Sequence, residues 1–151
     1  MQGLLALEDG RVFSGIGWGA EGVETGELVF NTSMTGYQEI LTDPSYYKQI
    51  VTMTVSHVGN TGINIEDVES EKVWVSGFVV RSLSPVVSNW RNRGDLNGYL
   101  REQGVIGLSE VDTRALVRYI RSKGVMRAAI ANGEAAKDPQ ALIEMARQSP
   151  D

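Results

Sequence analysis

The hydrophobic pattern of the first third of the chain predicts β-strands around a polar loop. Residues 4–14 (LLALEDGRVFS) contain two apolar runs joined by Asp9-Gly10, a pair typical of hairpin turns. Two more runs of β-branched and aromatic residues, 28–30 and 50–55, enclose a segment rich in Thr, Ser, Gly and Asp. Segment 49–55 alternates large apolar residues with Thr, which predicts a strand with one face on the core.

The rest of the chain predicts further strands separated by amphipathic helices. Residues 73–80 (VWVSGFVV) are expected to form a buried strand in which Gly77 marks a close approach or a bulge. Helices are expected at 95–103, 113–123 and 139–148, and strands at 105–108 and 125–131. The inward residues of these helices are expected to be Leu96, Tyr99, Leu100, Leu116, Val117, Ile120, Leu142, Ile143 and Met145.

Capping residues mark the ends of these helices. Asp112 precedes the second helix and Asp138-Pro139 precedes the third, while Gly104 and Gly124 follow the first and the second. The order of the elements, antiparallel strands first and strand–helix alternation later, predicts an α/β or α+β domain. We expect two packed sheets with helices on one side.

Composition narrows the class of protein. With 151 residues, 42% of them hydrophobic, the chain is long enough to form one domain with a sizeable core. A net charge of −5 argues against nucleic acid as a partner, because a phosphate backbone is bound by a basic surface. The absence of Cys excludes disulfides and thiolate metal sites, and the first residues (MQGLLALEDG) resemble neither a signal peptide nor a membrane segment. We therefore expect a cytoplasmic protein with no membrane partner.

The polar loop contains one candidate binding element, the sequence Thr42-Asp43-Pro44-Ser45-Tyr46. Asp43 can accept hydrogen bonds from backbone N–H groups ahead of it, and Pro44 has no N–H to leave unpaired, so the pair is expected to start a turn or short helix. Ser45 would then offer its hydroxyl to a ligand carboxylate or amide. The alternative is that Asp43 and Ser45 only cap each other's backbone.

Two other sequence features match patterns that are associated with binding or catalysis. Residues 15–20 (GIGWGA) fit a dinucleotide-binding fingerprint, but segment 21–26 contains two glycines instead of opening a helix, so we interpret the glycines as strand and loop. His57 is the only His, and without a second His or any Cys we interpret it as a loop residue bonded to backbone. A third feature is an acidic segment that contains Glu66, Asp67, Glu69 and Glu71. Because it lacks the glycine spacing of a metal-binding loop, we interpret it as a solvated helix rather than a metal site.

A loop rich in Arg and Asn contains a candidate interface residue. Trp90, followed by Arg91, could anchor a protein partner, since Trp and Arg dominate binding hot spots. The alternative is a Trp folded over its own loop. A polyanion site formed by Arg81, Arg91 and Arg93 has weak support on an acidic protein.

A second candidate interface lies on the expected helix 113–123. Arg114, Arg118 and Arg121 are spaced i, i+4 and i+7, so they line one side of that helix. They form either an ordinary solvated face or a docking face for an acidic partner surface.

Four segments together carry a family resemblance. They are FNTSMTGYQEILTDPSYYKQIVTMT (30–54), HVGNTGIN (57–64), SNWR (88–91) and VDTRALVRYIR (111–121). In this order they resemble the small, glutamine-hydrolysing chain of carbamoyl phosphate synthetase, and the likeness extends over residues 4–131. It implies a three-layer β/β/α swivelling domain with one mixed or parallel sheet, one antiparallel sheet and helices on one side.

The resemblance implies a non-catalytic amino-terminal domain at residues 1–131. Residues 132–151 would be a connector and terminal helix leading toward a class I glutamine amidotransferase domain, which holds a Cys-His-Glu triad in that family. Because this sequence has no Cys, it lacks the nucleophile, and we expect the fragment alone to be inactive.

The resemblance also implies partners. In that family a large chain makes carbamoyl phosphate from bicarbonate, ATP and ammonia for arginine and pyrimidine synthesis, and the ammonia comes from glutamine hydrolysed at the small chain. The domain would brace the glutaminase domain and dock the large chain as part of a heterodimer. ATP and Mg are expected on the large chain, and no cofactor is expected in this fragment. Ser45 matches the position that contacts L-glutamine.

Two rival interpretations belong to other classes. The chain could be a stand-alone binding module that uses the Ser45 loop or Trp90 for another ligand or protein. It could also be an independent hydrolase, which would require Ser45 and His57 within about 3 Å of each other and an orienting acid.

Overall fold

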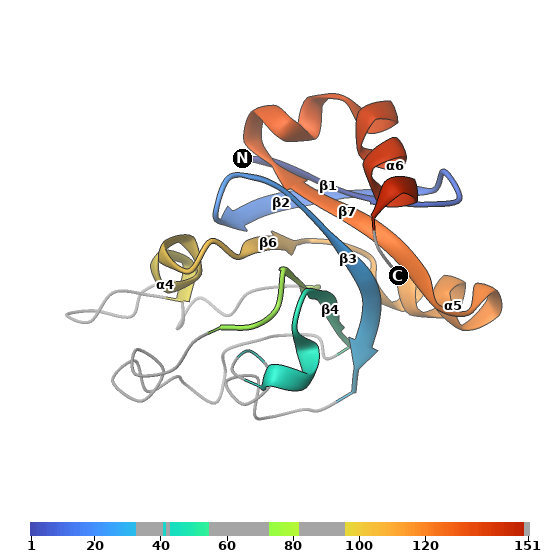
Figure 1. Cartoon of the computed structure of the whole chain (residues 1–151), viewed down its shortest axis with the longest axis horizontal. Helices are drawn as coiled ribbons and strands as arrows, with labels where there is room; N and C mark the ends of the chain where they lie inside the picture. The colour runs from blue at the N-terminus through green and yellow to red at the C-terminus, as the bar shows by residue number, and fades with distance from the viewer. Residues whose placement is uncertain (33–40, 42, 55–72, 82–95, 150–151) are drawn as a thin grey trace.

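The computed structural model of the chain describes residues 1–32, 41, 43–54, 73–81 and 96–149 (Figure 1). The strands are β1 Gln2–Leu7, β2 Val12–Gly19, β3 Gly22–Asn31, β4 Gln49–Met53, β5 Gly77–Val79, β6 Ile106–Ser109 and β7 Met126–Asn132. The α-helices are α4 Leu96–Glu102, α5 Thr113–Lys123 and α6 Pro139–Gln148, and two short 3-10 helices are η1 Pro44–Tyr46 and η2 Gly133–Lys137. No helix in the described part of the chain has the length and apolar character needed to cross a bilayer.

The seven described strands close into one barrel in the order β1-β2-β6-β5-β4-β3-β7. Four neighbouring strands, β3, β4, β5 and β6, pair in parallel and form one arc of the barrel. The other pairs are antiparallel, and β7 closes the barrel by pairing with β1 on one side and β3 on the other. The result is an α/β fold with a mixed sheet.

One closed barrel therefore stands where the sequence predicted two separate sheets. The parallel and antiparallel parts exist, but β7 joins them because both of its edges are hydrogen-bonded. The helices also lie around different strands rather than together: α6 packs on β1 and β7, and α4 packs on β2 and β6. Figure 1 shows α6 and α4 over different parts of the barrel.

The predicted hairpin is confirmed. Strands β1 and β2 pair antiparallel, with Leu4 opposite Ser14, around a turn at residues 8–11. Gly10 in this turn has a φ of 102°, a conformation that glycine adopts at little cost. The glycine-rich segment 15–19 lies within β2, so its interpretation as strand rather than nucleotide-binding turn is also confirmed.

The core consists of the barrel interior and two layers outside it. Inside, apolar side chains from the strands meet the buried face of α5, which includes Leu116 and Ile120. Outside, Leu142 and Ile143 of α6 cover β1 and β7. The other outer layer, here called the Trp18 cluster, contains Trp18, Leu41, Val51, Met53, Val73, Val75, Phe78, Val80, Leu100 and Val105.

Two sequence predictions about burial are wrong. Strand β4 buries both faces rather than one, because Ile50 faces the barrel interior while Val51 and Met53 join the Trp18 cluster outside. Even Thr52 is fully buried. In α6, Met145 remains 42% exposed, and the neighbouring Ala146 is the buried residue that packs on the barrel.

The helix caps agree with the sequence prediction. Asp112 accepts a hydrogen bond from the Ala115 amide at 3.0 Å, and Asp138 accepts one from the Ala141 amide at 3.2 Å. The strand predicted at 73–80 is limited to β5 at Gly77–Val79, and a Cβ at Gly77 would lie 2.8 Å from the Ile130 side chain. Gly77 therefore marks a close approach, as predicted.

A network around Arg127 fastens the end of α6 to the barrel. Its guanidinium donates to the Glu8 carboxylate, with Nη2 at 2.8 Å, and to the Ser149 carbonyl at 2.8 Å. The bond from the Arg127 backbone amide, followed by that from its guanidinium, holds the pKa of Glu8 below its ordinary value. Ser149 is thereby held next to β7.

The buried side chain of Asn132, the last residue of β7, ties three parts of the barrel together. Its Nδ2 lies within hydrogen-bond distance of the carbonyls of Trp18 at 2.8 Å, Gly107 at 2.9 Å and Ala20 at 3.2 Å. A Cβ at Gly3 would lie 2.7 Å from the Asn132 Oδ1, so glycine there makes room for this amide.

Replacing Asn132 is expected to destabilise the fold. Asn132→Ala removes the donor shared by three carbonyls at a fully buried position, and we expect a loss of about 2–4 kcal/mol in the free energy of unfolding, measured by urea denaturation. Asn132→Asp keeps the size but places a second acceptor against the same carbonyls, so its loss should be at least as large. Two variants as stable as the wild type would show that the amide does not hold the barrel closed.

Candidate functional site

Ser45 lies in the short helix η1, which begins as the sequence predicted. The Asp43 carboxylate accepts a hydrogen bond from the Ser45 amide at 2.9 Å, and Pro44 occupies the first helical position. The Asp43 carbonyl accepts a second bond from the Tyr46 amide at 3.1 Å. Asp43 thus caps the backbone of this turn.

The Ser45 side chain is exposed, and among the described residues no hydrogen bond of its hydroxyl is found. The alternative in which Asp43 and Ser45 cap each other's backbone is therefore seen only in one direction. Asp43 caps the Ser45 amide, but the Ser45 hydroxyl caps no backbone group within the described ranges. Ser45 is therefore exposed on a turn that is fixed by its neighbours, and its hydroxyl can donate a hydrogen bond to a ligand and accept one from it.

The two residues that follow η1 bring the chain back to the barrel. Lys48 has a φ of 59°, and its amide donates to the Trp74 carbonyl at 3.1 Å. The Lys48 carbonyl packs directly on β3 at Gly26, where any Cβ would overlap that oxygen. Gly26 is thus required for this turn to approach β3 so closely.

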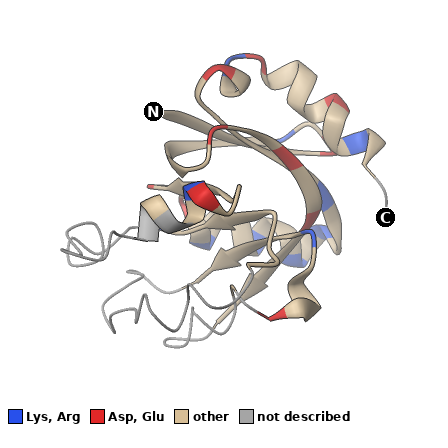
Figure 2. Cartoon of the chain, turned by 60° about the vertical axis from the view of Figure 1, so that its left-hand side comes forward, with Lys and Arg blue, Asp and Glu red and all other residues tan. Residues whose placement is uncertain are grey.

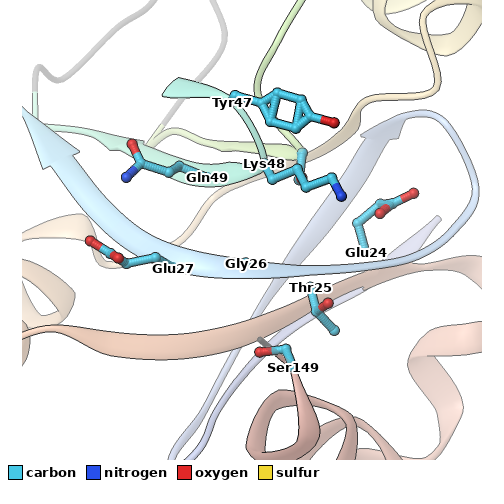
Figure 3. A pocket seen from close by; sticks show the side chains of 9 residues that line it. Glu24, Thr25, Gly26, Glu27, Tyr47, Lys48, Gln49 and Ser149 are labelled. Carbon is cyan, nitrogen blue, oxygen red and sulfur yellow. The ribbon is translucent and has the colours of Figure 1, made fainter. Parts of the chain in front are cut away.

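A hollow of about 460 Å³ lies beside this turn. Figure 3 shows Tyr47, Lys48 and Gln49 on one side of β3 and Ser149, from the end of α6, on the other side. The walls of the hollow carry both positive and negative side chains: Lys48 comes from the turn, and Glu24 and Glu27 come from β3. Among the described residues, the lining consists of Glu24, Thr25, Gly26, Glu27, Tyr47, Lys48, Gln49, Ser76 and Ser149.

The arginines of α5 form a second candidate surface. Arg114, Arg118 and Arg121 are all exposed, and Figure 2 shows cationic segments along this helix. The Arg121 guanidinium lies 5.1 Å from the ring centroid of Phe30, a cation–π contact. Arg121 also borders a mainly apolar groove of about 320 Å³ with Phe30, Ile120 and Val125, and Val125 is 75% exposed.

Several predicted site residues lie outside the described residues. Trp90, Arg91, Arg93, His57 and the four acidic residues of segment 66–71 belong to this set, so neither the Ser45–His57 pairing nor the Trp90 interface can be placed. Arg81 is described and exposed. In the described ranges no group of His, Cys, Asp and Glu side chains is arranged to hold a metal ion.

The sequence interpretation did not foresee how the Ser45 turn is held. The Asn31 Nδ2, at the end of β3, donates to the Tyr46 hydroxyl at 2.9 Å, and the Tyr46 ring packs against the Trp18 cluster. The signal available in the sequence was the position of Tyr46, an aromatic residue next to Ser45 in a polar segment. Nothing in the spacing paired it with Asn31.

Comparison with known proteins gives one family. The family described as "Carbamoyl-phosphate synthase small chain, CPSase domain" matches residues 5–130. The chain is 55% identical over 148 residues to a carbamoyl phosphate synthase small chain of Streptomyces avermitilis, covering 98% of this chain and 39% of that protein. A protein of the same name from Aquifex aeolicus is 56% identical over 148 residues, with the same coverage.

The chain therefore spans about two fifths of the length of these curated relatives. Among solved structures, an aminopeptidase from Aneurinibacillus sp. strain AM-1 aligns with a TM-score of 0.45 and 14% identity, covering 85% of this chain and 30% of that one. A likeness of this size carries no argument about fold or function.

Proposed function

The chain belongs to the family of carbamoyl-phosphate synthase small chains, and we propose that it works as the non-catalytic amino-terminal domain of a glutamine-hydrolysing small chain. The observation that carries the proposal is the 55% identity to one relative along nearly the whole of this chain. This chain spans only 39% of the length of that relative. A stand-alone binding module is not favoured, because that identity extends over the entire domain rather than over one motif.

In this proposal the chemistry of glutamine hydrolysis occurs on another domain. The sequence contains no Cys, so a class I glutamine amidotransferase domain would supply the nucleophile and its base. Residues 1–131 would form the bracing domain, and residues 132–151 would lead toward the amidotransferase domain. The exposed hydroxyl of Ser45, on a capped turn, supports a direct contact with L-glutamine.

The remaining partners follow from the same assignment. The large chain would bind ATP and Mg and convert bicarbonate and ammonia to carbamoyl phosphate for arginine and pyrimidine synthesis in the cytoplasm. The exposed arginines of α5 would contact this large chain as part of a heterodimer. The parallel and antiparallel arcs of the barrel would correspond to the two sheets of a three-layer swivelling domain, with α6 as the helical layer.

The first test is a reconstitution. We expect this chain alone to release no ammonia from glutamine, since it has no nucleophile for the amide carbon. Glutamine-dependent synthesis of carbamoyl phosphate should be recovered only when the carboxy-terminal half and the large chain are both added, measured by coupled ammonia and carbamoyl phosphate assays. Glutamine turnover by the chain alone would overturn the assignment.

The second test concerns Ser45. Ser45→Ala in the reconstituted synthetase is expected to raise the KM for glutamine by about tenfold or more, because a hydrogen bond to a charged group contributes about 1.5–3 kcal/mol. Synthesis driven by added ammonia should be unchanged, which serves as the internal control. An unchanged KM for glutamine would remove Ser45 from the binding site.

The third test concerns the α5 arginines. Reversing their charge with Arg114→Glu, Arg118→Glu and Arg121→Glu together is expected to weaken association with the large chain by about tenfold or more, because three charge pairs would become repulsive. Lys137→Glu, an exposed cation on η2, is the control for a general effect of charge. Equal affinity of the triple variant and the wild type, measured by calorimetry, would show that this face is only solvated.

A further inference from the structure

We propose that Tyr46 and Asn31 are positioning residues that hold the Ser45 hydroxyl in place for glutamine. This inference rests on the proposed function, because it explains how a contact on a short surface turn can be fixed. Tyr46 and Asn31 would affect the affinity for glutamine and not the bond-breaking step, since they would act through Ser45 and not contact the ligand themselves.

Tyr46 is the inward anchor of η1. Pro44 and Ser45 are exposed, whereas Tyr46 is partly buried and its ring packs against the Trp18 cluster. Its hydroxyl accepts the hydrogen bond from Asn31 Nδ2 at 2.9 Å. The residue next to Ser45 is therefore attached to the barrel both by apolar packing and by one directional bond.

Asn31 is itself fixed by the barrel. It is the last residue of β3 and lies opposite Met53 in the parallel pairing with β4. Its carbonyl accepts hydrogen bonds from the Thr54 amide at 3.1 Å and from the Thr54 hydroxyl at 3.2 Å. Because Asn31 is held in this way, its Nδ2 can fix the position of the Tyr46 hydroxyl.

The chain that follows η1 is held separately. Besides the bond from the Lys48 amide to Trp74, the rings of Tyr47 and Trp74 pack with their centroids 5.8 Å apart. Ser45 is thus followed directly by two attachments, Tyr46 to β3 and residues 47–48 to Trp74, while Asp43 caps the turn before it.

Such attachments matter because η1 cannot hold its own geometry. A 3-10 helix of three residues has poor internal hydrogen bonding and depends on its surroundings. A binding group must be kept within about 0.5 Å of its productive position by the residues that pack around it. Loosening Tyr46 should therefore weaken glutamine binding even though the Ser45 hydroxyl is still present.

The test is Tyr46→Phe in the reconstituted synthetase, which keeps the ring and removes only the hydroxyl. We expect the KM for glutamine to rise about 3- to 10-fold, the range for loss of one hydrogen bond, with little change in kcat. Ammonia-driven synthesis and the thermal midpoint should remain close to wild type. Tyr119→Phe, which removes a tyrosine hydroxyl that is hydrogen-bonded to Asp9 away from η1, is the matched control and should leave the KM unchanged.

A double-mutant cycle with Ser45→Ala separates this inference from the proposed function. If Tyr46 acts through Ser45, Tyr46→Phe adds little to the KM of the Ser45→Ala variant. Asn31→Asp should keep a KM near wild type, because the Tyr46 hydroxyl can then donate to the carboxylate.

Each outcome of this cycle is informative. A large effect of Ser45→Ala with none of Tyr46→Phe, or with fully additive effects, would overturn the positioning role while leaving the function intact. No effect of Ser45→Ala would overturn both.

Discussion

The parallel pairing of β3 and β4 is the constraint on which the candidate site depends. Two consecutive strands that run in the same direction need a crossover between them, and the chain that returns from the end of β3 to the start of β4 ends in η1. Because Gln49 pairs opposite Glu27, the residues just before Gln49 must approach the middle of β3. Gly26 permits that approach, and Ser45 lies in the exposed short helix that leads into it.

Closure of the barrel brings the end of α6 to the hollow that Lys48 also lines. Strand β7 pairs with both β1 and β3, and α6 then packs back over β1 and β7. Arg127 holds Ser149 by its carbonyl, and Ser149 lines the same hollow as Lys48. In the proposed small chain, polypeptide continuing from α6 would start at the hollow that Tyr47 and Lys48 also line.

Local signals in the sequence predicted many elements well because their causes are local. The Asp9-Gly10 hairpin, the Asp112 and Asp138 caps and the buried face of α5 depend on residues only a few positions apart. The start of η1 at Asp43-Pro44 belongs to the same group. The errors concern surroundings: Thr52 and Met145 have the expected secondary structure, but their burial depends on which distant elements cover them.

In the candidate site, too, the local features could be predicted from the sequence and the long-range contacts could not. The order of residues around Ser45 was enough to predict a turn started by Asp43-Pro44, but it left open whether the Ser45 hydroxyl is free or caps the backbone. The glutamine contact was an implication of the family resemblance. Only the folded chain determines that Tyr46 meets Asn31, that the turn rests on Gly26, and that seven strands close into one barrel. These features join residues between 15 and more than 100 positions apart, such as Asn132 and Trp18. Hydrophobic periodicity reports which face of an element is buried, but it carries no information about the partner that buries it.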